Sequence, residues 1–313
     1  MIAFIFPGQG SQKVGMGRSL VDAFPEARAV FDEAERALPR LTKVIFEGPE
    51  SDLVLTENAQ PAILTMSIAA QRVLAAHGIV PAFVAGHSLG EYSANVAVGT
   101  IDFADAVRIV RRRGQYMQEA VPVGAGAMAA ILGLEAEAVS QACEEAAEGE
   151  VVSPANVNGA GQVVIAGSTA AVQRAGARAK ALGAKRVIPL AVSAPFHCAL
   201  LKPAEERLEP ELRALSAQNP AVPVVANVDA EPKRDAASAI DALVRQVAAP
   251  VQWERVVRRL ASEGVTNYVE VGPGTVLSGL VKKIHREAVV ANFAGPDDLA
   301  AVQDALRIQP RHV

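Results

Sequence analysis

Cysteine, aromatic residues and net charge are all scarce in this chain of 313 residues. Cys143 and Cys198 are the two cysteines, which excludes a disulfide framework and is typical of a reducing compartment. The formal net charge of −4 provides no overall positive field that would attract nucleic acid. We therefore expect a cytoplasmic protein that has no nucleic-acid partner.

Long apolar runs are missing as well. Arginine, glutamate and glutamine interrupt the alanine-rich segments, so none reaches the roughly 18 residues that a membrane span needs. The apolar start, residues 1–6, lacks the positively charged lead and the cleavage site of a signal peptide, and we expect a first strand there. Because 50% of the residues are hydrophobic, we expect a substantial buried core and no membrane partner.

Short apolar segments alternate with helix-like segments along most of the chain. This order predicts an α/β protein, in which helices cover both faces of a mostly parallel sheet. One helix is expected to begin at Pro61, with Asn58 as its cap, and to run to about Ala76. Another is expected over residues 103–120, with Asp102 as its cap.

The pattern changes between residues 125 and 191. Strands are expected over 126–132, 151–157, 163–166 and 186–190, and helices over 135–147 and 169–182. This βαββαβ order is ferredoxin-like. We therefore expect an inserted ferredoxin-like subdomain over residues 125–191 and a catalytic core made of residues 1–124 and 192–313.

The stretch Gly86-His87-Ser88-Leu89-Gly90 carries the clearest chemical signal. The apolar residues 82–85 lead into it, and a helix-compatible run, 91–98, follows. Strand, sharp turn and helix in this order form a nucleophile elbow, which exposes its central serine at the edge of a sheet. Ser88 is the candidate nucleophile, and the main-chain N–H of Leu89 is placed to stabilise an oxyanion. The alternative is a tight turn whose serine has no chemical role.

A serine hydroxyl needs a base within hydrogen-bond reach to act as a nucleophile. His197 is the best candidate, because it lies in a loop before a helix, directly after the expected insertion. The remaining histidines are less suited to this role, because they lie at a helix end, next to the serine, in a basic helix and in the tail: His77, His87, His285 and His312.

Two questions about this base stay open on the residues alone. Cys198 follows His197, but adjacent residues on a helix do not face each other, so a Cys–His pair is the weaker alternative. No Asp or Glu lies at an obvious strand end between Ser88 and His197. A backbone or amide carbonyl is therefore expected to orient the imidazole.

Further polar residues are candidates for the same site. Gln9 lies between glycines in the loop that follows the first expected strand, where backbone can approach a ligand closely. Arg111, Arg112 and Arg113 are consecutive on the helix expected over 103–120. Because consecutive helical residues point about 100° apart, we expect one of the three to point inward.

Several motifs together resemble the malonyl-CoA:acyl carrier protein transacylases, and the resemblance covers nearly the whole chain. They occur in that family's order: residues 6–12 (FPGQGSQ), 86–91 (GHSLGE), Arg113-Gly114 with Met117-Gln118, 162–167 (QVVIAG), His197, Gln246 before 250–253 (PVQW), and 270–274 (EVGPG). Each motif alone is weak. The resemblance implies an α/β-hydrolase-like core that carries a ferredoxin-like insertion, in agreement with the expected order of elements.

The resemblance also implies the roles of individual residues. Ser88 would be the nucleophile and His197 its general base, with a carbonyl of Gln246 orienting the imidazole. Gln9 and the Leu89 N–H would form the oxyanion hole. Arg113 would bind the free carboxylate of the malonyl group.

Three further residues are weaker candidates by resemblance. Phe196 is similar to the bulky residue of malonyl-selective acyltransferases, and Asn156 and Asn158 lie on a stretch that borders the family's site. The implied reaction moves a malonyl group from malonyl-CoA to a holo acyl carrier protein through a malonyl-serine ester, with ping-pong kinetics, for fatty acid synthesis. We expect a monomer that needs no cofactor and no metal.

Other functions are less consistent with these residues. A serine esterase or thioesterase would share Ser88 and His197, but would have a carboxylate behind the base and no use for Arg113. An acyltransferase of a polyketide or malonate-utilising system would use the same site with another carrier. A non-catalytic binding module would not need the complete set of candidate residues.

Overall fold

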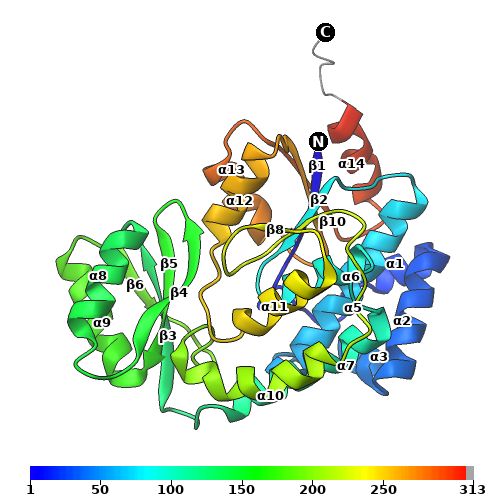
Figure 1. Ribbon diagram of the computed structural model, residues 1–313. Coiled ribbons are helices and arrows are strands. Elements are labelled where there is room, and N and C mark those ends of the chain that lie inside the picture. Colours follow the sequence, from blue (N-terminus) through cyan, green and yellow to red (C-terminus); the bar gives the residue numbers. More distant parts are fainter. Residues whose placement is uncertain (308–313) are drawn as a thin grey trace.

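Two β-sheets organise residues 1–307, the part of the chain that the computed structural model describes (Figure 1). His312 lies outside the described residues. The larger sheet has the strand order β10 (Val289–Phe293), β9 (Asn267–Val271), β1 (Ile2–Phe6), β2 (Phe83–Gly86), β7 (Val224–Val225) and β8 (Pro232–Lys233). All neighbouring strands are parallel except β7 and β8, which are antiparallel. The predicted α/β class with a mostly parallel sheet is confirmed.

Helices bury both faces of this sheet. Successive side chains of a strand point to opposite faces, so Phe4 and Phe6 pack on one side and Ala3 and Ile5 on the other. The helices on the Phe4 side are α1 (Arg18–Ala23), α2 (Pro25–Ala37), α3 (Leu41–Glu47), α4 (Glu50–Leu53), α5 (Thr56–Ala76), α6 (Leu89–Ala97), α7 (Phe103–Glu119), α10 (Lys202–Arg213), α11 (Ala236–Gln246) and α14 (Asp298–Arg307), with the short 3-10 helix Ala199–Leu201. The helices on the Ala3 side are α12 (Trp253–Ser262) and α13 (Val276–Ile284). Burial on both sides explains why the central strands are almost entirely apolar.

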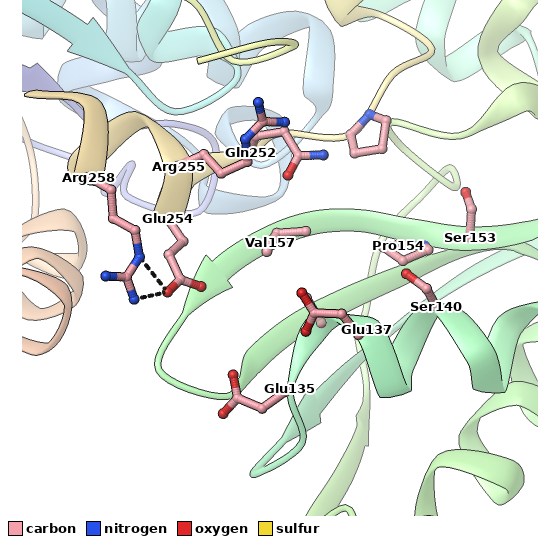
Figure 2. A pocket seen from close by; sticks show the side chains of 12 residues that line it. Glu135, Glu137, Ser140, Ser153, Pro154, Val157, Gln252, Glu254, Arg255 and Arg258 are labelled. Carbon is pink, nitrogen blue, oxygen red and sulfur yellow. Dashed lines mark hydrogen bonds and ion pairs between the residues drawn. The ribbon is translucent and has the colours of Figure 1, made fainter.

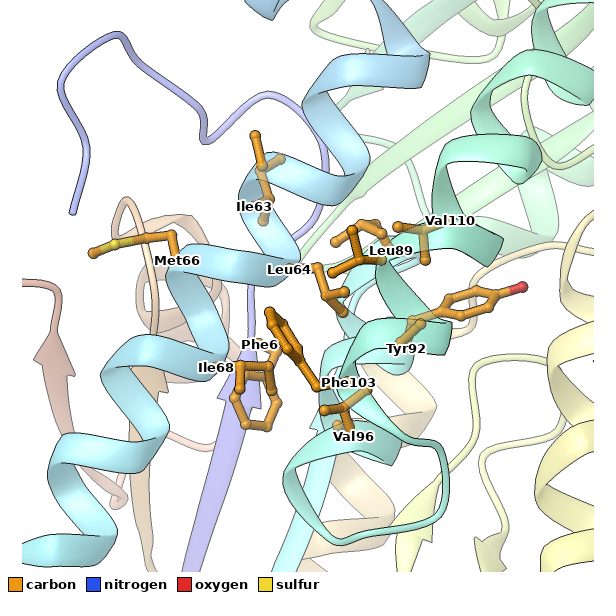
Figure 3. Close-up of a cluster of buried hydrophobic side chains, with 14 of the residues drawn as sticks. Phe6, Ile63, Leu64, Met66, Ile68, Leu89, Tyr92, Val96, Phe103 and Val110 are labelled. Atoms are coloured by element: carbon orange, nitrogen blue, oxygen red, sulfur yellow. The ribbon is translucent and has the colours of Figure 1, made fainter. Parts of the chain in front are cut away.

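The helix that follows β2 lies deep in this core. Figure 3 shows Leu89, Tyr92 and Val96 of α6 among buried side chains of β1, α5 and α7, such as Phe6 and Leu64. All of these side chains are fully or almost fully buried. The start of α6, which directly follows Ser88, is therefore held by packing on several sides.

The start of α5 differs from the prediction. The helix begins at Thr56 and contains Pro61, so the prediction that Pro61 opens it is wrong. Proline has no N–H, which leaves the carbonyl of Glu57 without its helical partner. Nη1 of Arg111 on α7 donates to this carbonyl at 3.3 Å. A contact between helices thus replaces the missing hydrogen bond.

The smaller sheet is antiparallel and is built from residues 126–189. Its strand order is β4 (Val152–Gly159), β5 (Gln162–Ser168), β3 (Gly126–Leu132) and β6 (Arg186–Pro189). Helices α8 (Ala136–Ala146) and α9 (Thr169–Ala181) cover one face. The elements follow one another in the predicted order, strand, helix, strand, strand, helix, strand.

The other face of the smaller sheet packs against the rest of the protein. Met128 and Val164 contact Phe196 and Cys198 of the loop that carries His197. Main-chain hydrogen bonds also join the two parts, because Val251 lies beside β4 and pairs with it as an isolated bridge. The side chains on either side of His197, Phe196 and Cys198, therefore pack against the smaller sheet.

Replacing Gly90 by alanine should destabilise the protein strongly. A Cβ on Gly90 would lie 2.0 Å from the main-chain oxygen of Phe6, and the overlap could be relieved only by moving α6 away from β1. We expect the free energy of unfolding to fall by about 3 kcal/mol or more in urea denaturation.

Gly279→Ala is the matched control for Gly90→Ala. Gly279 is an exposed glycine within α13, and a Cβ there would meet no atom within 4 Å. Alanine should raise the free energy of unfolding by about 0.5–1 kcal/mol. Equal stability of the two variants would contradict the close contact between α6 and β1.

Among residues 1–307, no helix combines the length and the apolar character required to cross a membrane.

Candidate active site

Ser88 lies between β2 and α6 in a strained main-chain conformation. Its φ and ψ angles are 52° and −108°, a region that costs a non-glycine residue about 1–3 kcal/mol. Two buried side chains hold it there. Oδ1 of Asn227 accepts from the Ser88 N–H at 2.8 Å, and Nε2 of Gln246 donates to the Ser88 carbonyl at 2.9 Å. The half-buried hydroxyl is thereby presented at the carboxyl end of β2.

His197 lies within hydrogen-bond distance of that hydroxyl. Its Nε2 is 2.7 Å from Ser88 Oγ, and its Nδ1 is 2.9 Å from the main-chain oxygen of Gln246. Because a carbonyl can only accept, Nδ1 carries the proton and Nε2 is free to accept the serine proton. The carbonyl that orients the imidazole is thus a main-chain one.

The surroundings of His197 keep its imidazole neutral. Burial lowers its pKa to about 3, and the nearby positive charge of Arg113 acts in the same direction. Both effects disfavour the protonated ring. At neutral pH the ring is therefore available as a base.

We expect the His197 imidazole to show no titration between about pH 5 and 8, where a histidine of ordinary pKa would titrate. Two-dimensional NMR of the histidine-labelled protein measures this, with His197→Gln to assign the signal. In Arg113→Gln, loss of the positive charge should raise the pKa. A midpoint near 6.5 in the unmodified protein would contradict the inferred neutral base.

The three consecutive arginines of α7 point in different directions. Arg111 is half-buried and forms an ion pair with Glu57 at 3.1 Å, and Arg112 is exposed and pairs with Glu211. Arg113 is 1% exposed and points inward. The structure thus brings one of the three to the site.

Arg113 is a buried cation whose side-chain hydrogen bonds go to neutral groups. Its Nη1 donates to Gln60 at 2.8 Å, and its Nη2 donates to Gln246 Oε1 at 2.8 Å and to Ser88 Oγ at 3.1 Å. Its Cζ lies 5.2 Å from the ring centre of Tyr92. Within residues 1–307 no carboxylate lies within ion-pair distance of the guanidinium. A buried arginine that lacks an anion beside a candidate nucleophile is suited to a ligand that carries one.

These groups line a pocket of about 350 Å³ between the two sheets. The predicted residues that line it are Gln9, Ser88, Leu89, Arg113, Asn156, Phe196 and His197.

Leu89 is the first residue of α6, so its N–H has no acceptor within the helix. Nε2 of Gln9 donates to Thr56 Oγ1 at 3.1 Å. Gln246 does not line the pocket but lies behind Ser88 and His197.

Asn158 has a different place from the other candidates. Its Oδ1 lies 2.9 Å from Nε2 of His87, whose ring packs near Trp253. Burial lowers the pKa of His87. The side chain of Asn158 is therefore bonded to a residue of the GHSLG motif rather than directed at Ser88 or His197.

Sequence reasoning missed two residues that hold Ser88. Asn227 lies two residues after the end of β7, and a polar residue near the carboxyl end of a parallel strand was the available signal. Glu91 ends the GHSLGE motif and is buried, with Oε2 accepting from the Asn227 N–H at 3.0 Å and from Gln246 Nε2 at 2.8 Å. Its contacts depend on residues more than a hundred positions away, which no local pattern reveals.

A larger hollow of about 500 Å³ lies between α8, β4 and α12 (Figure 2). Glu135 and Glu137 line one side, and Arg255 and Arg258 line the other. Arg258 already pairs with Glu254. The hollow contains neither Ser88 nor His197, so the candidate nucleophile and the candidate base belong to the smaller pocket.

The pocket with Ser88 has the parts of an acyl-transfer site. A serine and a neutral imidazole lie within hydrogen-bond distance, a helix-terminal N–H follows the serine, and a guanidinium that has no carboxylate partner within residues 1–307 lies beside them. Such a set can attack a carbonyl and stabilise the oxyanion. The guanidinium favours an acyl group with a free carboxylate.

Comparison with known proteins gives consistent similarities over nearly the whole chain. Residues 3–309 match the acyl transferase domain family. A relative from Escherichia coli (strain K12), the malonyl CoA-acyl carrier protein transacylase, is 52% identical over 301 residues, which are 96% of this chain and 97% of the relative.

Solved structures are similar to the same extent. An acyl carrier protein S-malonyltransferase from Vibrio cholerae is 48% identical with a TM-score of 0.94, covering 96% of this chain and 99% of that chain. The malonyl-transacylase in the PlMCAT:AntF structure, solved in complex with its type II PKS acyl-carrier protein, is 46% identical with a TM-score of 0.94. That similarity covers 97% of this chain and 99% of that chain.

Proposed function

This chain belongs to the acyl transferase domain family and, within it, to the malonyl CoA-acyl carrier protein transacylases, and on that premise we propose that it transfers the malonyl group of malonyl-CoA to the thiol of an acyl carrier protein. The product would supply fatty acid synthesis. One observation carries the choice of acyl group: Arg113 is buried beside Ser88, and no carboxylate in the described part of the chain, residues 1–307, pairs with it.

In the first half-reaction, Ser88 Oγ attacks the thioester carbonyl of malonyl-CoA while Nε2 of His197 takes the serine proton. Gln9 and the Leu89 N–H stabilise the oxyanion, and the carboxylate binds Arg113, whose planar guanidinium offers two parallel donors. The C–S bond then breaks, His197 returns the proton to the leaving thiol, and a malonyl ester stays on Ser88.

In the second half-reaction, the thiol of the carrier's pantetheine takes the place of coenzyme A. His197 accepts the thiol proton, the sulfur attacks the ester carbonyl, and the ester C–O bond breaks as His197 returns the proton to Ser88 Oγ. Because both half-reactions use the same groups in reverse order, the kinetics should be ping-pong. Phe196, on the wall of the pocket, would limit the size of the acyl group.

The finer description of the fold is part of the same proposal. Residues 1–124 and 192–313 would form an α/β-hydrolase-like core, which the strained serine between β2 and α6 supports. Residues 125–191 would form a ferredoxin-like subdomain, supported by the strand order β4, β5, β3, β6 with two helices on one face. The acyl pocket would then lie between the two units.

The carrier could belong to fatty acid or to polyketide synthesis. One similar structure is a complex with a type II polyketide carrier, which favours a site that accepts such a carrier too. Transfer rates to a fatty acid carrier and to a polyketide carrier, measured side by side, distinguish the two roles.

The proposed reaction is tested by product analysis. Malonyl-CoA and holo acyl carrier protein should give malonyl-carrier and free coenzyme A in equal amounts, and initial rates at several carrier concentrations should give parallel double-reciprocal lines. Release of coenzyme A with free malonate and no malonyl-carrier would identify a hydrolase instead.

A further inference from the structure

Ser88 is held at both ends of its main chain by the side chains of two residues, Asn227 and Gln246, which both also donate a hydrogen bond to one carboxylate oxygen. Asn227 binds the Ser88 N–H, and Gln246 binds the Ser88 carbonyl. Oε2 of Glu91 accepts from both of these residues, at 3.0 Å from the Asn227 main-chain N and at 2.8 Å from Gln246 Nε2. Glu91 thus closes a ring of hydrogen bonds around the nucleophile.

The Gln246 side chain has a different partner at each end. Its Oε1 accepts from Nη2 of Arg113 at 2.8 Å, while its Nε2 donates to Ser88 O and to Glu91 Oε2. If the amide turned by 180°, its NH2 group would face the donor of Arg113, and its oxygen would face two acceptors. The site therefore admits one orientation of this amide.

We propose that Glu91 is a positioning residue for the transfer reaction, which fixes the Gln246 side-chain amide in the orientation that serves both Arg113 and Ser88. Glu91 touches no substrate in this role and acts through Gln246 and Asn227. The role requires an acceptor oxygen at the Oε2 position, whichever charge the carboxyl group carries. Burial raises the pKa of Glu91 to about 7, which is consistent with an acceptor that works in both protonation states.

The inference rests on the proposed function, since it predicts how substrates are discriminated. Without the Glu91 acceptor, Ser88 would be less well placed to attack any thioester. Arg113 would also be less well placed, which affects only an acyl group that carries a carboxylate. A small displacement of reacting groups can cost about a hundredfold in rate. Loss of Glu91 should therefore weaken malonyl transfer more than acetyl transfer.

The test compares Glu91→Leu, which removes the acceptor, with Glu91→Gln, which retains an oxygen in its place. The readout is kcat/KM for loading from malonyl-CoA and, separately, from acetyl-CoA, with thermal unfolding as a check of folding. In Glu91→Leu we expect kcat/KM to fall about 100-fold for malonyl-CoA and about 10-fold for acetyl-CoA. In Glu91→Gln both values should stay within about threefold of the unmodified enzyme.

A second variant keeps the proposal testable if Glu91→Leu does not fold. Gln246→Met removes the amide but leaves the main-chain carbonyl that orients His197. It should lower the ratio of kcat/KM for malonyl-CoA to kcat/KM for acetyl-CoA as much as Glu91→Leu does. The double variant, Gln246→Met with Glu91→Leu, should lower this ratio no further.

An unchanged malonyl-to-acetyl ratio in folded Glu91→Leu would overturn the proposal, as would the same loss in Glu91→Gln as in Glu91→Leu. If Glu91→Leu does not fold, an unchanged ratio in Gln246→Met would overturn it. Failure of the proposed function is distinguishable, because the unmodified enzyme would then not be loaded by malonyl-CoA at all.

Discussion

Ser88→Ala should lower kcat for malonyl transfer by about 10⁴-fold or more, because no ester can form without the hydroxyl oxygen. The fold should be retained, since Asn227 and Gln246 hold the main chain of residue 88 and not its side chain. Steady-state transfer from malonyl-CoA to holo carrier protein measures the effect.

Ser93→Ala is the matched control for Ser88→Ala. Ser93 lies on α6 as well, and its buried hydroxyl has no hydrogen-bond partner among residues 1–307. Its removal should leave kcat unchanged and should not lower the free energy of unfolding. Equal activity of the two alanine variants would show that Ser88 is not the nucleophile.

Arg113→Ala should remove the preference for malonyl over acetyl donors. An acetyl group leaves the buried guanidinium unpaired, and breaking a buried ion pair costs on the order of 3–5 kcal/mol, which corresponds to about two to four orders of magnitude in kcat/KM. We therefore expect kcat/KM to fall by this amount for malonyl-CoA and far less for acetyl-CoA.

Arg112→Ala provides the control on the same helix. Arg112 is exposed and pairs with Glu211 on the surface, an interaction worth about 0–1 kcal/mol. Its loss should leave the ratio of kcat/KM for malonyl-CoA to kcat/KM for acetyl-CoA unchanged. If Arg113→Ala also kept the ratio of the unmodified enzyme, Arg113 would not be the carboxylate-binding residue.

The sequence was most informative where a local pattern determines a local shape. The glycines of the GHSLG motif predict close approach of strand and helix, and the structure shows that a Cβ on Gly86 or Gly90 would overlap with main-chain atoms. The strand and helix order of residues 126–189 could be predicted for the same reason. The order of elements depends on local patterns, whereas the motif predicts a close approach without naming the partner, because Gly90 meets the main chain of Phe6.

The sequence was less informative where a feature depends on distant partners. The start of α5 could not be predicted, because Arg111 of another helix compensates for the proline inside it. Helical spacing alone predicts that one of three arginines points inward, and only the family resemblance named Arg113; the physical reason is its packing against Gln60 and Tyr92 in the folded chain. Asn227 and Glu91 were missed because their partners come together only in the folded chain.

The most direct measurement is the intact mass of the protein after brief exposure to malonyl-CoA, with Ser88→Ala alongside. We expect one malonyl group on the unmodified protein, none on Ser88→Ala, and loss of the group when holo carrier protein is added. A group that also forms on Ser88→Ala, or one that water removes as fast as the carrier does, would contradict transfer through Ser88.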